Sequence, residues 1–240
     1  YAFTDKNGNF TMSNITEISR YSDTFVRSIW FALIATLICL VIAYPLAYIM
    51  SKTTGNAQRT LMMIVMLPMW MNFLLRTYSW MLILDDTGIL NTLFMHIGLG
   101  QAKMINTSGA VILGMVYNYL PYMILPIYSV MTKLDKRLFE ACEDLGGNSV
   151  TVFSKVVMPL SVPGVISGIT MVFVPSVSTF YISQKLGGGK FPLIGDVIEM
   201  QFQTAYNYNL GAAISLVLMV LILLCLFVME KYAGDDGEEI

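Results

Sequence analysis

Long apolar runs separated by short charged clusters dominate this sequence. Charged residues leave gaps at 28–51, 60–84 (interrupted only by Arg76), 104–132, 156–184 and 200–229. A bilayer core needs about 20 apolar residues per helix, so each gap is long enough to span it. Lipid offers the backbone no hydrogen bonds, and the runs lack the alternation of barrel strands, so helices are expected. The pattern predicts an all-α, polytopic membrane protein with spans at about 28–51, 61–84, 107–132, 160–183 and 209–229.

Prolines interrupt most of the predicted spans, and they leave two interpretations open. Membrane bundles tolerate such breaks where neighbouring groups satisfy the freed carbonyls, which would give bent helices around a path. Proline is also common in ordinary membrane helices. The residues concerned are Pro45, Pro68, Pro121, Pro126, Pro163 and Pro175.

Composition supports the membrane assignment and excludes other classes. Of the 240 residues 56% are hydrophobic and 12% are charged, against about 25% charged in typical soluble domains. A net charge of -2 without a basic stripe does not indicate a nucleic-acid partner. Three distant cysteines and one histidine, His96, form no metal-ligand spacing, and a disulfide framework is not expected. No metal or cofactor is therefore expected on this chain.

The connection between the third and fourth predicted spans, residues 133–159, carries the most specific pattern. Leu134, Leu138, Ala141, Cys142 and Leu145 fall at helical spacing and give one apolar face. Gly146 and Gly147 would stop this helix, and Asn148 or Ser149 would cap a second one. The expected product is a helix, a sharp turn and a helix on the water side of the membrane. Such a knob suits docking into a soluble partner, although a plain amphipathic loop would show the same pattern.

This segment resembles the EAA loop of ABC importer permeases. That pattern is Glu-Ala-Ala, three residues, Gly, nine residues, then Ile-x-Leu-Pro. The sequence matches it without a gap, with three conservative departures at Cys142, Val156 and Met158. The matched positions are Glu140, Ala141, Cys142, Gly146, Val156, Met158 and Pro159. The resemblance implies a type I importer permease fold and a cytoplasmic coupling helix that docks on an ATPase subunit.

Further stretches resemble, within that family, the permeases of spermidine/putrescine importers. They are 28–48, 67–84, 133–148 and, most specifically, 180–202. The resemblance implies an ABC ATPase dimer carrying ATP and Mg, a second homologous permease, an extracytoplasmic polyamine-binding protein and lipid as partners. It places the chain in a bacterial inner membrane with a cytoplasmic acidic tail at 231–240. It also implies a sixth span before Tyr1, which would make 1–24 extracytoplasmic and 25–230 the permease domain.

Aromatic and polar residues near the predicted span ends suit the passage of a polycation. Aromatic faces bind cations, and carboxylates pair with them; aromatic side chains also belt the interface of any membrane protein. The candidate path residues are Trp70, Asn72, Tyr78, Tyr117, Tyr122, Tyr181 and Asp196.

Arg76 does not suit a polycation route, because its guanidinium would repel the solute. A charge within a span is a functional hypothesis by default. Arg76 could pair with Asp85, Asp86 or a carboxylate of a partner subunit, or it could snorkel to the interface. If it bound solute, it would favour an anion such as sulfate or a phosphonate, so an importer of sulfate, phosphonate or iron is the alternative.

Two other classes were weighed against transport. The sequence contains no Gly-x-x-x-x-Gly-Lys-Ser/Thr phosphate loop, so ATP hydrolysis is expected on a separate subunit. A membrane-embedded enzyme would need catalytic groups at membrane depth, and the predicted spans contain no Asp, Glu or His. A channel or secondary carrier has no need of an ATPase-docking loop. The sequence therefore predicts a non-enzymatic transport subunit.

Overall fold

The computed structural model describes residues 1–4 and 9–234, and most of these residues are helical. The helices are α1 (Ser13–Ile18), α2 (Ser22–Lys52), α3 (Gly55–Trp70), α4 (Phe73–Leu84), α5 (Ile89–His96), α6 (Ser108–Met131), α7 (Lys136–Asp144), α8 (Ser149–Val152), α9 (Met158–Ser178), α10 (Tyr181–Gly187), α11 (Ile194–Gln203) and α12 (Tyr208–Gly234). A 3-10 turn (Ser19–Tyr21) joins α1 to α2, and a π-helical turn (Phe153–Val157) joins α8 to α9.

Three long helices, α2, α6 and α9, form the centre of the molecule. Two glycines on α9 let its backbone approach α6 closely: a Cβ at Gly164 would lie 2.9 Å from the carbonyl oxygen of Pro126, and one at Gly168 would lie 2.7 Å from the sulfur of Met123. Membrane helices associate mainly through packing, so small residues at such a seam allow tight contact. Gly164 and Gly168 stand one turn apart and form this seam.

A second packing unit joins α12 to α1, α11 and the start of α2. Its buried residues include Phe25, Ile194, Leu210 and Ile214. The backbone N–H of Ile194 donates to the Ser28 hydroxyl at 2.8 Å, which ties the start of α11 to α2.

The observed helices agree only in part with the five straight spans that the sequence predicts. Among residues 1–4 and 9–234, four helical stretches are long and apolar enough to cross a membrane: Ser13–Lys52, Ser108–Met131, Ser149–Ser178 and Tyr208–Met229. The second expected span, 61–84, is instead a bent pair in which α3 meets the helical segment Phe73–His96 at 93°. The expected span 160–183 is divided too, because α9 ends at Ser178 and α10 begins at Tyr181.

Proline alone does not decide where these helices break. Pro45, Pro121 and Pro126 lie inside continuous helices. The α3–α4 break instead contains Asn72, whose side chain accepts a hydrogen bond from the Leu74 N–H at 2.8 Å and so caps the new helix. A capped restart is tolerated because it satisfies a backbone donor that would otherwise lack a partner.

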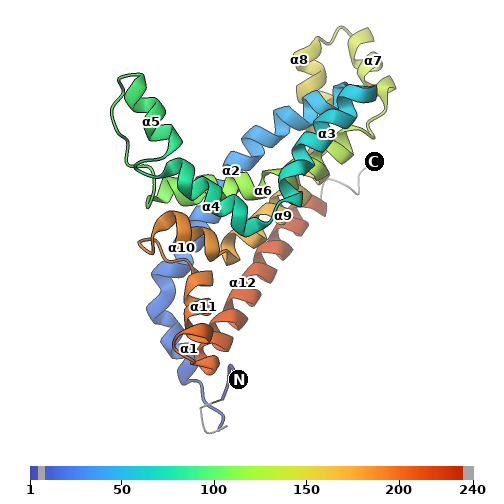
Figure 1. Cartoon of the computed structure of the whole chain (residues 1–240). Coiled ribbons are helices and arrows are strands. Elements are labelled where there is room, and N and C mark those ends of the chain that lie inside the picture. The colour runs from blue at the N-terminus through green and yellow to red at the C-terminus, as the bar shows by residue number, and fades with distance from the viewer. Residues whose placement is uncertain (5–8, 235–240) are drawn as a thin grey trace.

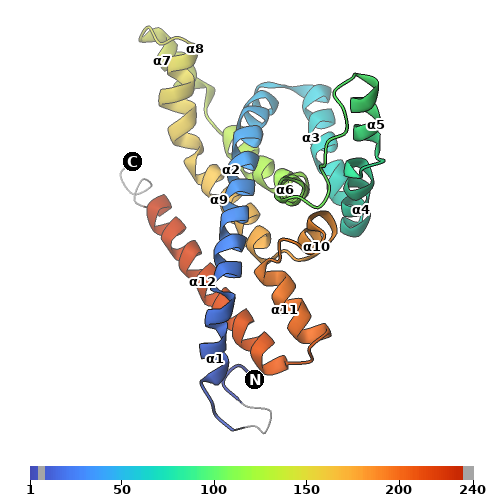
Figure 2. The same cartoon turned by 90° about the vertical axis from the view of Figure 1, so that its left-hand side faces the viewer.

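The two ends of the molecule carry different structures (Figure 1). The α7–α8 hairpin projects from one end, and α1, α11 and the N-terminus lie at the other, in both views (Figures 1 and 2). The helices α4 and α10 lie near the middle, beside α6. The acidic tail predicted at 231–240 falls largely outside the described residues.

The α6–α9 seam generates a stability prediction. Gly168→Leu should lower the free energy of unfolding by about 1–3 kcal/mol, because the new side chain would have to displace Met123 or separate the helices. Thermal unfolding of the detergent-purified chain measures this. Ser167→Leu, on the neighbouring exposed position, is the matched control. Equal unfolding midpoints for the two variants would contradict the seam.

Candidate coupling site and solute path

The hairpin built by α7 and α8 has a glycine turn that fixes its shape. The Gly146 N–H donates to the Glu143 carbonyl, and the Gly147 N–H donates to the Cys142 carbonyl, both at 2.9 Å. This pair of bonds is a Schellman ending, which requires a left-handed residue, and Gly146 has a φ of 82°. Asn148 then caps α8 by accepting from the Thr151 N–H at 2.9 Å. The predicted helix, turn and helix are confirmed, with Asn148 rather than Ser149 as the cap.

The second glycine of the turn is needed for space. A Cβ at Gly147 would lie 2.6 Å from the Cys142 carbonyl oxygen and 2.8 Å from its sulfur. Cys142 therefore lies directly beneath the turn, and any side chain at position 147 would clash with it.

The last part of the motif, which ends at Pro159, overlaps and follows the π-helical turn Phe153–Val157. Proline has no N–H and its ring clashes with the carbonyl four residues earlier, which here is that of Lys155. A π turn widens the helix locally, and such turns are frequent at functional sites. Val156 lies within it, and Met158 and Pro159 follow it at the start of α9. The hairpin is therefore joined to α9 through a widened, proline-containing turn.

The tip of the hairpin presents an apolar surface that the chain itself does not cover. Leu145 is 90% exposed, and Leu138, Ala141 and Val150 are exposed as well. The apolar face predicted for this segment is thus divided: Leu134 and Cys142 pack against the core, whereas Leu138, Ala141 and Leu145 are exposed. Apolar side chains gathered on a projecting knob are typical of a docking surface.

The hairpin is held from below by one face of α2. Tyr44, Tyr48 and Lys52 recur every four residues there, which places them in a row. The Phe153 ring packs against the Tyr44 ring at 5.8 Å and the Tyr48 ring at 5.2 Å, in both cases edge to face. The Lys52 ammonium lies 5.3 Å from the Tyr48 ring and 5.1 Å from the Phe139 ring. Sequence reasoning missed this row, although its spacing of four was a readable signal.

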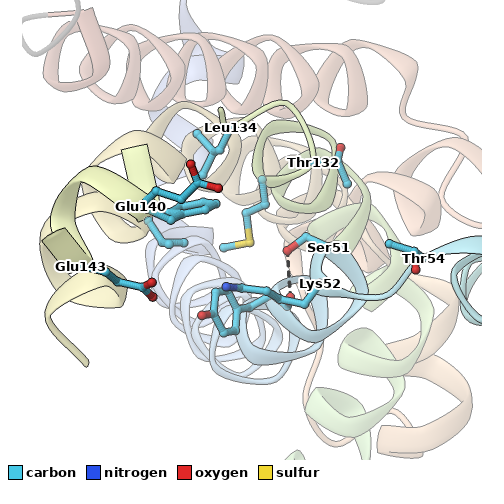
Figure 3. Close-up of a pocket in the computed structure, with 11 residues that line it drawn as sticks. Ser51, Lys52, Thr54, Thr132, Leu134, Glu140 and Glu143 are labelled. Carbon is cyan, nitrogen blue, oxygen red and sulfur yellow. Dashed lines mark hydrogen bonds between the residues drawn. The ribbon is translucent and has the colours of Figure 1, made fainter. Parts of the chain in front are cut away.

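A cavity of about 330 Å³ lies between this face of α2 and α7. Figure 3 shows Lys52 from α2 opposite Glu140 and Glu143 from α7 along its wall. Hydroxyl groups of Ser51, Thr54 and Thr132 complete the polar lining. Glu140, the acidic residue of the motif, therefore lines an open cleft at the base of the hairpin, where it can pair with a basic group.

The candidate path residues do not gather at one point. Trp70 ends α3 and is 81% exposed, while Asn72 caps α4, so the cap is its role within this chain. Tyr117 packs edge to face on Trp80 at 5.3 Å, and Tyr122 stays exposed on α6. The structure brings together one pair, Tyr78 of α4 and Tyr181 of α10, with ring centroids 6.1 Å apart.

Asp196 occupies the opposite side of α10 from that pair. Its carboxylate accepts hydrogen bonds from the Leu193 N–H at 2.6 Å and the Ser183 hydroxyl at 2.7 Å, while its other oxygen is buried without a partner. Burial is the largest cause that raises the pKa of Asp196, to about 6, and these hydrogen bonds oppose the shift. The neighbouring Glu199 accepts a hydrogen bond from Gln184.

Arg76 neither snorkels nor pairs with Asp85 or Asp86. It is 7% exposed, and its Nε and Nη1 atoms are buried without a hydrogen-bond partner. The guanidinium lies 6.0 Å from the Phe73 ring. The Arg76 side chain, which belongs to α4, is buried and therefore does not line an open route. Within residues 1–4 and 9–234, no group of three or more acidic, histidine or cysteine side chains could hold a metal ion.

Comparison with known proteins places these features in a family. Residues 43–232 match the family described as the binding-protein-dependent transport system inner membrane component. The chain is 42% identical to the spermidine/putrescine transport system permease protein PotB of Haemophilus influenzae, over 92% of this chain and 79% of that protein. It is 38% identical to PotB of Escherichia coli, over 91% of this chain and 81% of that protein.

Solved structures share the fold at low sequence identity. A chain of a bacterial ABC transporter involved in the import of the acidic polysaccharide alginate superposes with a TM-score of 0.78 at 13% identity, covering 97% of this chain and 86% of that one. A chain of the MetNI methionine ABC transporter in an inward-facing conformation superposes with a TM-score of 0.71 at 15% identity, covering 95% of this chain and 100% of that one. The predicted fold is confirmed, and the chain belongs to the family of inner membrane components of binding-protein-dependent transport systems.

Proposed function

We propose that this chain is one permease subunit of an ATP-driven polyamine importer in a bacterial inner membrane. The observation that carries the proposal is 36–42% identity to permeases named for spermidine and putrescine, over most of the chain. The paired rings of Tyr78 and Tyr181 and the carboxylates of Asp196 and Glu199 are chemically suited to ammonium groups. The subunit carries out no chemistry itself.

In this proposal the α7–α8 hairpin lies in the cytoplasm and docks on an ABC ATPase dimer that binds ATP and Mg. The exposed residues Leu138, Leu145 and Val150 would enter an apolar groove, and Glu140 would pair with a basic group beside it. The C-terminus lies on the same side. A second homologous permease completes the path, and an extracytoplasmic binding protein delivers the solute. The buried position of Arg76 gives no support to sulfate, phosphonate or iron as the alternative cargo.

Uptake measurements test both the class and the substrate. Cells lacking polyamine transport would express the chain with its ATPase, second permease and binding protein. Labelled spermidine should enter in an ATP-dependent manner, and Glu140→Ala combined with Gly146→Leu should abolish uptake, because the pairing group and the turn are both lost. Sulfate serves as the control solute. Sulfate uptake without spermidine uptake would overturn the polyamine assignment and keep the importer class.

If the ATPase docks on the hairpin tip, a substitution at the tip should weaken ATPase binding without affecting the fold. Leu145→Asp should weaken copurification of the ATPase at least about tenfold, since a charge would enter an apolar contact, while the fold is kept because Leu145 is 90% exposed. Met12→Asp, also at an exposed residue but at the opposite end of the molecule, is the matched control. Equal ATPase recovery with both variants would place the docking surface elsewhere.

The raised pKa of Asp196 predicts a pH dependence. Above about 6 the carboxyl is ionised and attracts ammonium groups; below that value it is neutral and the attraction is lost. Uptake should therefore fall as the external pH drops through about 6. Asp196→Asn should transport less at every pH and lose this step. Solute binding by the isolated receptor over the same pH range is the control. If uptake by Asp196→Asn still falls as the pH drops through about 6, a group other than Asp196 causes the pH dependence.

A further inference from the structure

The short helix α10 presents an aromatic cage for an ammonium ion on its α4 side. Tyr181 and Lys185 stand one turn apart on α10, and Tyr78 faces them from α4. The two tyrosine rings meet edge to face, with centroids 6.1 Å apart at 81°. The Lys185 ammonium lies 5.6 Å from the Tyr78 ring centroid and 5.7 Å from that of Tyr181. Two rings thus share one cation, and that cation belongs to the chain itself.

The cage is accessible. Tyr78 is exposed, and Tyr181 and Lys185 are only partly buried. Asp196 accepts from Ser183 on the opposite face of α10, and Glu199 accepts from Gln184 on the flank next to Tyr181. The Lys185 ammonium makes a cation–π contact with each ring, and each such contact is weak enough to exchange at an exposed site.

We propose that Tyr78 and Tyr181 form an alkylammonium subsite on the solute path, which Lys185 occupies between substrates and vacates when the solute enters. The inference rests on the proposed polyamine function and names a binding site for it. A lysine side chain is a primary ammonium on a four-carbon stem, and one end of putrescine has the same chemistry. A site that accepts Lys185 therefore accepts the end of a linear polyamine and offers nothing to an anion.

The contrasting possibility is a static clamp, in which Lys185 only fastens α10 to α4. Both alternatives predict the same resting geometry, and they differ in what added amine does. A clamp keeps Lys185 on the rings at any amine concentration. An occupied subsite releases it, and removal of the lysine makes the cage available to solute.

Nuclear magnetic resonance of the receptor-free transporter in nanodiscs separates the two. Reductive ¹³C-dimethylation keeps the charge of each lysine and labels it. The Lys185 signal, identified by its loss in Lys185→Arg, should be shifted upfield by the tyrosine rings. Added putrescine should move it to the unshifted position, while sodium chloride at equal ionic strength should not. Lys190, exposed in the following loop, is the matched control and should not move.

Binding of labelled putrescine to the same receptor-free complex gives a second readout. Lys185→Met should bind at least about fivefold more tightly, because no internal ammonium competes for the two rings. Tyr78→Leu, which removes the ring, should bind at least about fivefold more weakly than Tyr78→Phe, which keeps it. A Lys185 signal that stays shifted in saturating putrescine, with unchanged affinity in Lys185→Met, would overturn the subsite. If that complex still takes up spermidine, the proposed function stands; a complex that takes up no polyamine would overturn both.

Discussion

Close contact between α6 and α9 is the constraint on which the functional parts depend. Gly164 and Gly168 have no side chains, so the backbone of α9 lies directly against α6 at both positions. Because the contact is this close, a movement of α9 has to be accompanied by a movement of α6. α9 also carries both candidate sites: the π-helical turn joins its start to the α7–α8 hairpin, and Thr179 joins its end to α10. In the proposed importer, a displacement of the hairpin would act on one end of α9, and the other end of α9 leads to Tyr181.

The buried guanidinium of Arg76 has a consistent place in this arrangement. Breaking α9 before α10 leaves carbonyl groups at the end of a helix, which carries partial negative charge. Both Arg76 and Thr179, the residue at the break, lie close enough to Tyr119 to act on its hydroxyl group. A fixed positive charge near this break opposes the negative end of the α9 dipole.

Sequence patterns predicted the fold well, because apolar length and the motif at 133–159 report directly on burial and turns. The glycine turn and the Asn148 cap followed from local chemistry, and both are present. The 93° bend after Trp70 could not be read from proline positions, since other prolines sit within continuous helices. Tyr78 and Tyr181 were both predicted on the path, but their pairing with Lys185 depends on how α10 folds back on α4, which is a tertiary contact between distant segments.

The molecule places a lysine between two aromatic rings at two locations, and their surroundings give the two sites different properties. Lys52 lies between Tyr48 and Phe139, whose helices are joined further by Phe153 and by a common buried cluster, so separating the rings would disrupt packing. Lys185 lies between the rings of α4 and of the seven-residue helix α10, and no comparable cluster encloses those rings among the described residues. The exposure of the two lysines does not separate the sites, because Lys52 is exposed and Lys185 is partly buried. The difference lies in the packing around the rings: the first pair is held by the surrounding cluster, whereas the second pair has less packing to hold it and can exchange its lysine for another ammonium ion.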